Sequence, residues 1–289
     1  MNSLIDEIKS IYKVKGGYKE VHLKFKELIG EISSETILFD VIEKNLLDNN
    51  FLSQNWDSSS IPKLNFYQDE NITIYINLFF PTKDENNFAM HLPHHHGNFD
   101  FISIIIYGNG YHTMTFDVID EITKSNRLTL SDDFYHHLKK SYFLDSMRPH
   151  VIFNPSDFTV SVAVWTKSPS INEFNVENRI NYSIERNKII EIKESEFISK
   201  VQLDKLYTEN SEKHIQGICY FISKIGYDNK RVFESILLNK KCNKYWYKWI
   251  NKLKNFEKIK MPLWYENLNT LGVNISKNQI RSICKRRFF

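Results

Sequence analysis

Hydrophobic residues in the first 55 positions recur at the spacing of α-helices. Two stripes repeat every three to four residues, and they consist of Leu4, Ile5, Ile8 and Ile11, and of Ile37, Leu38, Val41, Ile42 and Leu46. The Gly16-Gly17 pair is expected to end the first helix, because glycine commonly follows a helix and breaks its pattern. This part of the chain is therefore predicted to be a helical arm.

Between about residues 60 and 170 the pattern changes to short apolar, β-branched and aromatic runs, which are typical of strands. Residues 72–80 form one such run, and Pro81 stops it. Two pairs of runs are separated by turn signals and are expected to form hairpins. They are residues 101–106 with 111–116 across Gly108-Asn109-Gly110, and residues 151–153 with 158–165 across Asn154-Pro155-Ser156-Asp157.

One helix is expected within this zone, because Ser131 precedes Asp132 and Asp133 as a helix start does, and the pattern continues to Leu138. From about residue 195 helical periodicity resumes in four stretches, at 215–225, 232–238, 245–256 and near Ile280. We therefore predict an α+β protein with an antiparallel β-barrel or jelly-roll core. The predicted boundaries are a helical arm at 1–58, the β core at 59–170 and a basic helical tail at 171–289.

The composition is that of a folded protein, but the charge is unevenly distributed. Hydrophobic residues make up 42% and charged residues 25% of the 289 residues, and only 9 Gly and 7 Pro are present, which excludes collagen-like and linker-like chains. From Lys200 onward 19 Lys and Arg stand against 7 Asp and Glu, a net charge of about +12, while the rest carries about −9. The tail is either a solvated lysine-rich surface or a basic face for an acidic peptide, carrier protein or nucleic acid.

The sequence also indicates a location. Cys219, Cys242 and Cys284 are few, odd in number and widely spaced, which favours a reducing compartment over a disulfide framework. The N-terminal residues mix acids and bases and do not resemble a signal peptide. No segment approaches the roughly 20 apolar residues that span a bilayer. We expect a cytoplasmic protein with no membrane association.

The densest chemical signal is HLPHHHGNFD at residues 91–100, immediately before a predicted strand. Imidazole is the commonest protein ligand for late first-row metals. His94 and His96 are separated by one residue, so on an extended segment both point to the same face, and His95 points to the other. Pro93 favours extended backbone over a helix carrying two histidines. These features predict a metal site.

At these residues the chain resembles the cupin superfamily. His-x-His, an acid, an apolar strand and a Gly turn are similar to its first motif, and Pro149-His150-Val151-Ile152-Phe153-Asn154 is similar to its second. The resemblance covers roughly residues 70–167 and implies a small antiparallel barrel holding one divalent metal. It implies His94, His96 and His150 as ligands, with Asp100 as the carboxylate. The family's usual spacing falls on Phe101 instead, so either a one-residue bulge turns Asp100 inward or the site has three histidines and no acid.

For the other polar side chains near the motifs, the sequence predicts either a role in substrate binding or a position in the barrel core. Arg148 and Lys167 are candidates for binding an acidic substrate or co-substrate, and His112 and Tyr107 are further candidates for substrate binding. His112 is expected to be a barrel histidine with its hydrogen bonds satisfied, and Tyr107 and Trp165 to be barrel core. The remaining histidines are expected beside the metal ligands or in solvent (His91, His95), or exposed on the inserted helix (His136, His137).

A site of neutral histidines with at most one carboxylate suits Fe(II), and Mn, Ni, Cu and Zn bind the same donors. The leading interpretation is a non-haem iron oxygenase or hydroxylase acting on a small molecule or on an amino acid bound to a peptide or carrier protein, with 2-oxoglutarate as an undecided co-substrate. Metal-dependent isomerisation or hydrolysis stays open. The alternative is a ligand sensor whose tail binds nucleic acid, but the tail shows no clear recognition-helix pattern, and its aromatic residues 245–249 are expected to pack against the barrel.

Overall fold

The computed structural model describes residues 2–14, 17–54, 56, 61–81, 94–96, 99–118, 128–146, 148–167, 180–185, 188–193 and 210–254. The chain divides into two compact units, each built from two separate stretches. The first unit comprises Met1–Ile29 and Phe66–Thr208, and the second comprises Gly30–Asn65 and Glu209–Phe289. The predicted stretch near Ile280 lies outside the described residues. The boundaries 1–58, 59–170 and 171–289 stay a prediction.

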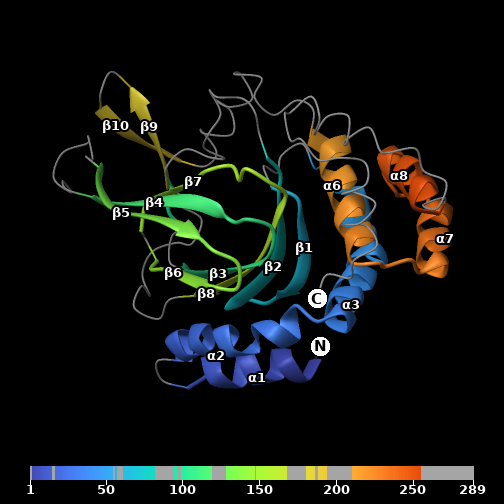
Figure 1. The fold of residues 1–289 in the computed structure, drawn as a ribbon, viewed down its shortest axis with the longest axis horizontal. Coiled ribbons are helices and arrows are strands. Elements are labelled where there is room, and N and C mark those ends of the chain that lie inside the picture. Colours follow the sequence, from blue (N-terminus) through green and yellow to red (C-terminus); the bar gives the residue numbers. More distant parts are fainter. Residues whose placement is uncertain are drawn as a thin grey trace. The chain divides into compact units, whose positions relative to one another are not determined.

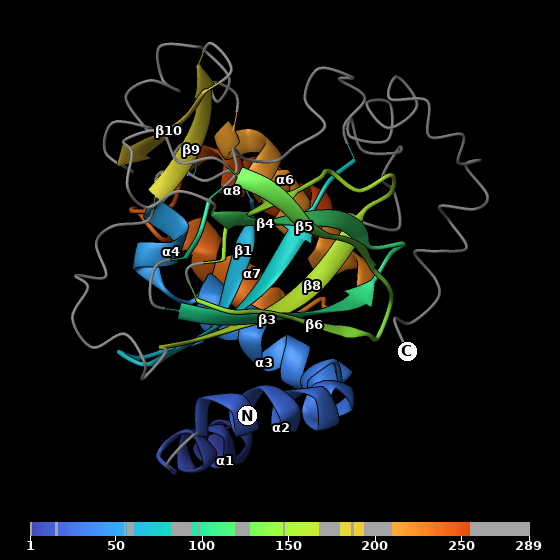
Figure 2. The same ribbon diagram turned by 90° about the vertical axis from the view of Figure 1, so that its left-hand side faces the viewer.

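The β core of the first unit consists of two antiparallel sheets that face each other (Figures 1 and 2). One sheet has the strand order β1-β2-β8-β3-β6 and the other the order β5-β4-β7. The strands are β1 (Lys63–Gln68), β2 (Ile72–Phe79), β3 (Phe99–Tyr107), β4 (Tyr111–Val118), β5 (Leu128–His136), β6 (Ser141–Leu144), β7 (His150–Ile152) and β8 (Thr159–Lys167). We call these two sheets the barrel. The predicted α+β class, with an antiparallel β core and helices before and after it in the sequence, is confirmed.

Two helices, α1 (Asn2–Tyr12) and α2 (Gly17–Ile32), lie against the outer face of the larger sheet (Figure 1). The Tyr12 hydroxyl donates to the Lys167 carbonyl oxygen at 2.8 Å, and a His22 ring nitrogen lies 3.0 Å from the Thr166 hydroxyl. The His22 ring also meets Phe143 edge-on at 4.9 Å. The predicted break at Gly16-Gly17 is confirmed, because α2 begins at Gly17.

The two predicted hairpins are wrong, because both turns carry the chain from one sheet to the other. β3 pairs with β6 and β8, whereas β4 pairs with β5 and β7. The two turn glycines allow the chain to pass from one sheet to the other. Gly108 and Gly110 have φ of 88° and 93°, and a Cβ on either would overlap a carbonyl oxygen, that of Phe158 or of His136. Only glycine combines this backbone conformation with so close an approach.

The predicted helix at 131–138 is also wrong, because residues 128–136 form strand β5. The Ser-Asp-Asp sequence is a local signal for a helix start, but β5 pairs along its length with β4. Burial alternates along β5 as it does in a strand, since Phe134 and His136 are more buried than their neighbours Tyr135 and His137. A further hairpin, β9 (Ile180–Glu185) with β10 (Lys188–Lys193), lies where only helices were expected.

Alternate residues of β3 and β8 point to opposite faces of the larger sheet, and this fixes what can line the barrel. Ser103 points inward, since its hydroxyl contacts Tyr111 and His136 of the smaller sheet. Thr166 points outward, since it contacts His22 of α2. Phe101 and Trp165 oppose each other across the strand pair and share the inward face, whereas Asp100 opposes Thr166 on the outward face.

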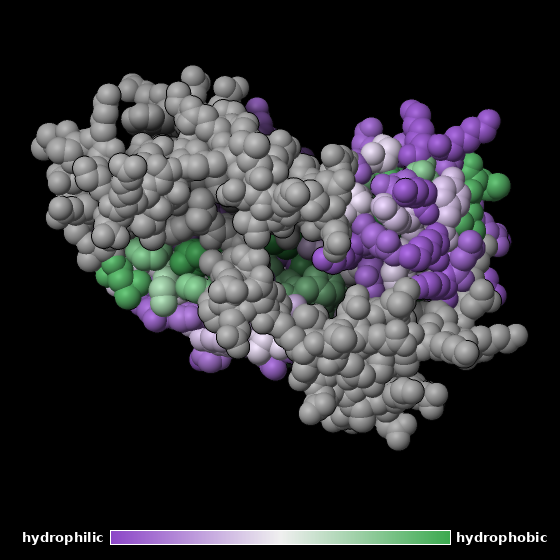
Figure 3. All heavy atoms as spheres, turned by 90° about the horizontal axis from the view of Figure 1, so that it is seen from above, coloured by the Kyte–Doolittle hydropathy of each residue, from purple (hydrophilic) through white to green (hydrophobic). Residues whose placement is uncertain are grey.

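The second unit is helical apart from the start of β1. Its helices are α3 (Glu35–Leu46), α4 (Asn49–Ser53), α6 (Asn210–Lys224), α7 (Lys230–Leu238) and α8 (Lys244–Lys254). In α8, Trp246 and Trp249 are buried, and Trp246 packs on Phe51 of α4 with ring centroids 5.9 Å apart. The aromatic residues of the tail thus pack within their own helical unit. Hydrophilic side chains gather over these helices (Figure 3).

No helix in the described part of the chain is long and apolar enough to cross a membrane.

Candidate metal centre

A backbone bridge joins the two motifs that the sequence places 56 residues apart. His94 and His150 form an isolated antiparallel bridge, in which each amide donates to the other's carbonyl oxygen, at 3.0 and 2.8 Å. His150 begins β7, whose pairing with β4 places it opposite Thr115. His96 follows two residues after His94, so both side chains lie on the same side of the extended segment.

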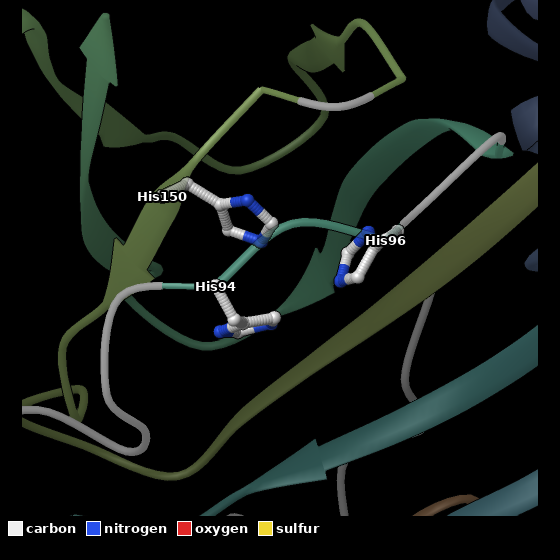
Figure 4. Close-up of side chains that lie close together, drawn as sticks. All are labelled: His94, His96 and His150. Atoms are coloured by element: carbon white, nitrogen blue, oxygen red, sulfur yellow. The ribbon is translucent and has the colours of Figure 1, made fainter. Parts of the chain in front are cut away.

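The rings of His94, His96 and His150 turn toward one another (Figure 4). Their centroids are 5.2, 4.5 and 4.6 Å apart, and one ring nitrogen from each lies within 4.8 Å of the others. Three imidazole nitrogens bound to one ion at about 2.1 Å lie about 3.0 to 3.6 Å from one another, so the rings need to close by up to about 2 Å. We call these three residues the histidine triad. The donor set fits a late first-row divalent ion.

The protein itself orients two of these rings. The Nδ1 of His150 lies 3.0 Å from the Arg148 carbonyl oxygen, which can only accept, so Nδ1 carries the proton and Nε2 presents its lone pair. The His96 ring stacks on Trp165 at 4.7 Å and 23°, and Phe101 meets it edge-on at 5.4 Å. His94 and His150 are buried, and His96 is half-buried. The site is therefore shaped before any ion binds.

Asp100 is not brought into the triad. It lies on the outward face of β3, and its Oδ1 accepts from the Ser146 amide at 2.8 Å. The irregularity in β3 lies between Ile105 and Tyr107, so no bulge turns Asp100 inward. Among the described residues, the group able to hold a metal consists of the three histidines alone. Of the two alternatives, the geometry favours the site without a carboxylate.

The two predicted anion-binding residues lie at the triad end of the barrel. Arg148 donates to the Asp117 carboxylate and, at 3.3 Å, to the Ser131 hydroxyl. Lys167 ends β8, two residues after Trp165, and is half-buried. Substrate binding by Arg148 and Lys167 stays a prediction.

Tyr107 and His112 lie elsewhere. Tyr107 stands at the end of β3 far from Phe101 and contacts Phe158, with ring centroids 5.9 Å apart. His112 is on β4 but points outward, where its Nε2 pairs with the Asp133 carboxylate and its ring stacks on Phe153 at 5.3 Å. His112 is a hydrogen-bonded histidine on a barrel strand, as expected. It does not face the barrel interior, as its candidate role in substrate binding requires, because alternation on β4 gives the inward face to Thr113.

The histidine that does face inward is His136, which was expected to be exposed on a helix. Its Nδ1 lies 3.0 Å from the Ser103 hydroxyl and its Nε2 2.9 Å from the Thr113 hydroxyl. Burial lowers the pKa of His136 to about 3, and burial raises the pKa of Tyr111, which stacks on it, to about 12. The predicted helix at 131–138 placed His136 at the surface. In a strand, alternate residues share a face, so residues 134 and 136 lie together on the buried side.

The other histidines of the motif differ in outcome. His137 is exposed, as expected. His95 is 1% exposed, so the solvent-facing alternative does not hold for it. His91 lies outside the described residues.

No family model matches the sequence, and no curated protein matches it. Among solved structures, TT1209 from Thermus thermophilus is 14% identical, covering 40% of this chain and 92% of that chain at a TM-score of 0.27. The cupin protein BF4112 from Bacteroides fragilis is 13% identical (37% and 75%, TM-score 0.25), and the Cnp3 cupin domain from Schizosaccharomyces pombe is 8% identical (40% and 70%, TM-score 0.29). These likenesses concern the fold and say nothing of function.

The chain's own geometry agrees with the resemblance that its sequence motifs carry. Two antiparallel sheets face each other, and a His-x-His segment bridges to a histidine that begins a strand of the smaller sheet. These are the features that the resemblance implies, in the region where it was recognised. The β region of this protein therefore has the two facing antiparallel sheets and the bridged histidine motifs that its resemblance to the cupin superfamily implies.

Proposed function

We propose that the protein is a metal-dependent cupin enzyme that uses Fe(II) to oxidise an organic substrate, as an oxygenase or hydroxylase. The observation that supports this most is the convergence of three imidazoles from two distant stretches of chain, with His94 and His150 buried. Three protein ligands leave open coordination positions for substrate and oxidant, an arrangement typical of catalytic sites. Fe(II) bound there would supply the activation of O2.

The residues around the triad supply orientation and shielding. The Arg148 carbonyl oxygen fixes the His150 ring, while Trp165 stacks on the His96 ring and Phe101 meets it edge-on. Aromatic side chains beside a reactive centre reduce its contact with bulk water, which limits unproductive reactions of oxidising species. A site with these properties serves oxidation better than a purely structural role, which needs no open position.

The proposed substrate is a small molecule or an amino acid carried by a peptide or carrier protein. The basic second unit is proposed to dock an acidic partner of this kind. Along α8, Lys244, Lys248 and Lys252 recur every four residues, which places them on one side of the helix, and Lys248 pairs with Glu212 of α6. Reversing the charges of Lys240, Lys241, Lys244 and Lys248 is expected to raise KM with little change in kcat.

The location proposed is a reducing one, the cytoplasm. Among the described residues Cys219 and Cys242 are both free thiols.

The test is metal analysis of protein purified without oxygen, compared with His94→Ala and His150→Ala. His137→Ala is the matched control, because it removes an exposed histidine outside the triad. We expect about one Fe(II) in the wild type and the control, and loss of metal in both triad variants. Full occupancy in both variants would discard the site.

The reaction class is tested with the iron-loaded protein. O2 uptake with and without 2-oxoglutarate decides whether that acid is a co-substrate. Iron without O2 uptake toward any organic substrate would favour isomerisation or hydrolysis instead. Salt-sensitive binding of duplex DNA with no turnover would favour the sensor.

A further inference from the structure

Arg148 faces Asp117 across two paired strands. Thr115 opposes His150, and the Phe116 amide donates to the Pro149 carbonyl oxygen at 2.8 Å, so the next residues along the pairing are Asp117 and Arg148. The guanidinium of Arg148 donates to the Asp117 carboxylate. The pair is accessible to solvent, with 33% of the arginine and 59% of the aspartate side chain exposed.

This ion pair shares a face of the smaller sheet with the histidine triad. Arg148 lies just before β7 and pairs with Asp117 of β4, so it lies on the side of the sheet that Asp117 occupies. On β4, Asp117 lies on the same side as Thr115 and Thr113, and Thr113 contacts the inward-facing His136. The cation therefore stands at the rim of the barrel beside the proposed metal.

A second cation approaches from the larger sheet. Trp165 stacks on His96, and Lys167 is two residues further along β8, so it points to the same face at the strand's end. Two positively charged residues, Arg148 just before β7 and Lys167 at the end of β8, thus lie at the triad end of the barrel. An arrangement of this kind favours an anionic group bound next to the metal.

Apolar surface adjoins these cations inside the barrel. Phe101 and Ala163 are buried there, and Trp165 and Phe134 pack on them while remaining partly accessible. Tyr75 meets Trp165 edge-on at 6.1 Å and is also half-buried. The outward-facing Ile104 and Val162, by contrast, are at most 1% exposed. Solvent therefore reaches an aromatic surface on the inward side.

We propose that this end of the barrel binds an organic carboxylate with an apolar body, and that the carboxylate replaces Asp117 as the partner of Arg148. Asp117 then serves as a resting partner that neutralises the arginine until a substrate arrives. The inference rests on the proposed function, because it places the acid beside the proposed metal. It names the substrate class and a residue, Asp117, that opposes binding.

The experiment titrates phenylacetate, its uncharged isostere phenylacetamide, and acetate into the full chain by calorimetry. Each titration is done on metal-free and on Zn(II)-loaded protein, with metal content measured in the same samples. The variants are Arg148→Gln and Asp117→Asn. Glu7→Gln is the matched control, because it makes the same charge change as Asp117→Asn in a pair with Lys24 on the outer helices.

We expect phenylacetate to bind at least about tenfold more tightly than either phenylacetamide or acetate. Arg148→Gln is expected to bring phenylacetate down to the level of the amide. Asp117→Asn is expected to tighten phenylacetate about two- to fivefold, since a partly exposed competing ion pair is removed, and to leave phenylacetamide unchanged. Glu7→Gln is expected to change neither.

Unchanged or weaker binding of phenylacetate in Asp117→Asn would overturn the inference, and so would an equal gain in Glu7→Gln. Absence of carboxylate binding to the wild type would overturn it as well. The Asp117→Asn comparison stands even where Arg148→Gln fails to fold. A failure of the proposed function can be recognised separately. The protein would then take up no metal, while the titration of the metal-free protein would still measure carboxylate binding by Arg148.

Discussion

Two buried neutral histidines are expected to make the first unit sensitive to acid. Burial lowers the pKa of both His22 and His136 to about 3, from an ordinary value of 6.5. Each ring is hydrogen-bonded to a hydroxyl, His22 to Thr166 and His136 to Ser103 and Thr113, and no carboxylate in the described part of the chain raises the pKa of either ring. Because the folded-state pKa is lowered, the unfolded chain takes up protons first as the pH falls.

The magnitude follows from the two pKa values. Stability is fully present above pH 6.5 and is lost between there and about pH 3. At pH 5 protonation favours the unfolded chain by about 2 kcal/mol for each histidine, whereas at pH 7 it favours neither state to a measurable extent. Together, the two histidines are therefore expected to lower the free energy of unfolding by about 4 kcal/mol between pH 7 and pH 5, which is a large fraction of a typical domain's stability.

The assay is urea unfolding followed by circular dichroism at pH 7 and pH 5. His22→Gln and His136→Gln keep a hydrogen-bonding group and remove the titration, so each is expected to lose about 2 kcal/mol less than the wild type between the two pH values. His137→Gln is the control, because His137 is exposed at the end of β5. If either buried variant loses as much stability as the wild type, the two rings are not held neutral in the folded protein.

Other residues give sharper tests of single contacts. Trp165→Leu is expected to weaken metal binding about three- to tenfold by releasing the His96 ring, and Trp165→Phe to restore most of it; equal affinity in all three proteins would contradict the stacking role. Asp100→Asn is expected to leave metal content unchanged and to lower the free energy of unfolding by about 1 kcal/mol through its bond to the Ser146 amide; loss of metal would return Asp100 to the ligand set. Gly110→Ala is expected to lower the free energy of unfolding by more than about 3 kcal/mol, and Gly226→Ala by about 1 kcal/mol. Both glycines have positive φ, but only at Gly110 would the new Cβ overlap backbone atoms. Similar losses of stability in the two variants would refute that overlap.

The residues that the sequence predicts best are those whose evidence is local. The spacing of His94 and His96 alone places them on one face, the Gly16-Gly17 pair predicts the break between the first two helices, and Pro81 predicts that the strand beginning at Ile72 ends before it. The second motif added His150 because its order in the chain fits the resemblance. Each of these conclusions depends on a few neighbouring residues.

The errors arose where distant pairing overrides a local signal. Gly108-Asn109-Gly110 has the composition of a hairpin turn, yet the two strands it joins belong to different sheets. Ser131-Asp132-Asp133 has the composition of a helix start, yet pairing with β4 makes it a strand. The orientation of Asp100 depended on whether β3 had a bulge before Phe101, which only the pairing with β8 reveals.

The central claim is that three imidazoles from the two motifs hold one ion inside the barrel. Anomalous diffraction from crystals grown with cobalt or iron, recorded at the metal's absorption edge, measures this directly. The account predicts a single strong peak about 2.1 Å from one nitrogen each of residues 94, 96 and 150. A peak at any other group of side chains, or none in crystals saturated with metal, would contradict it.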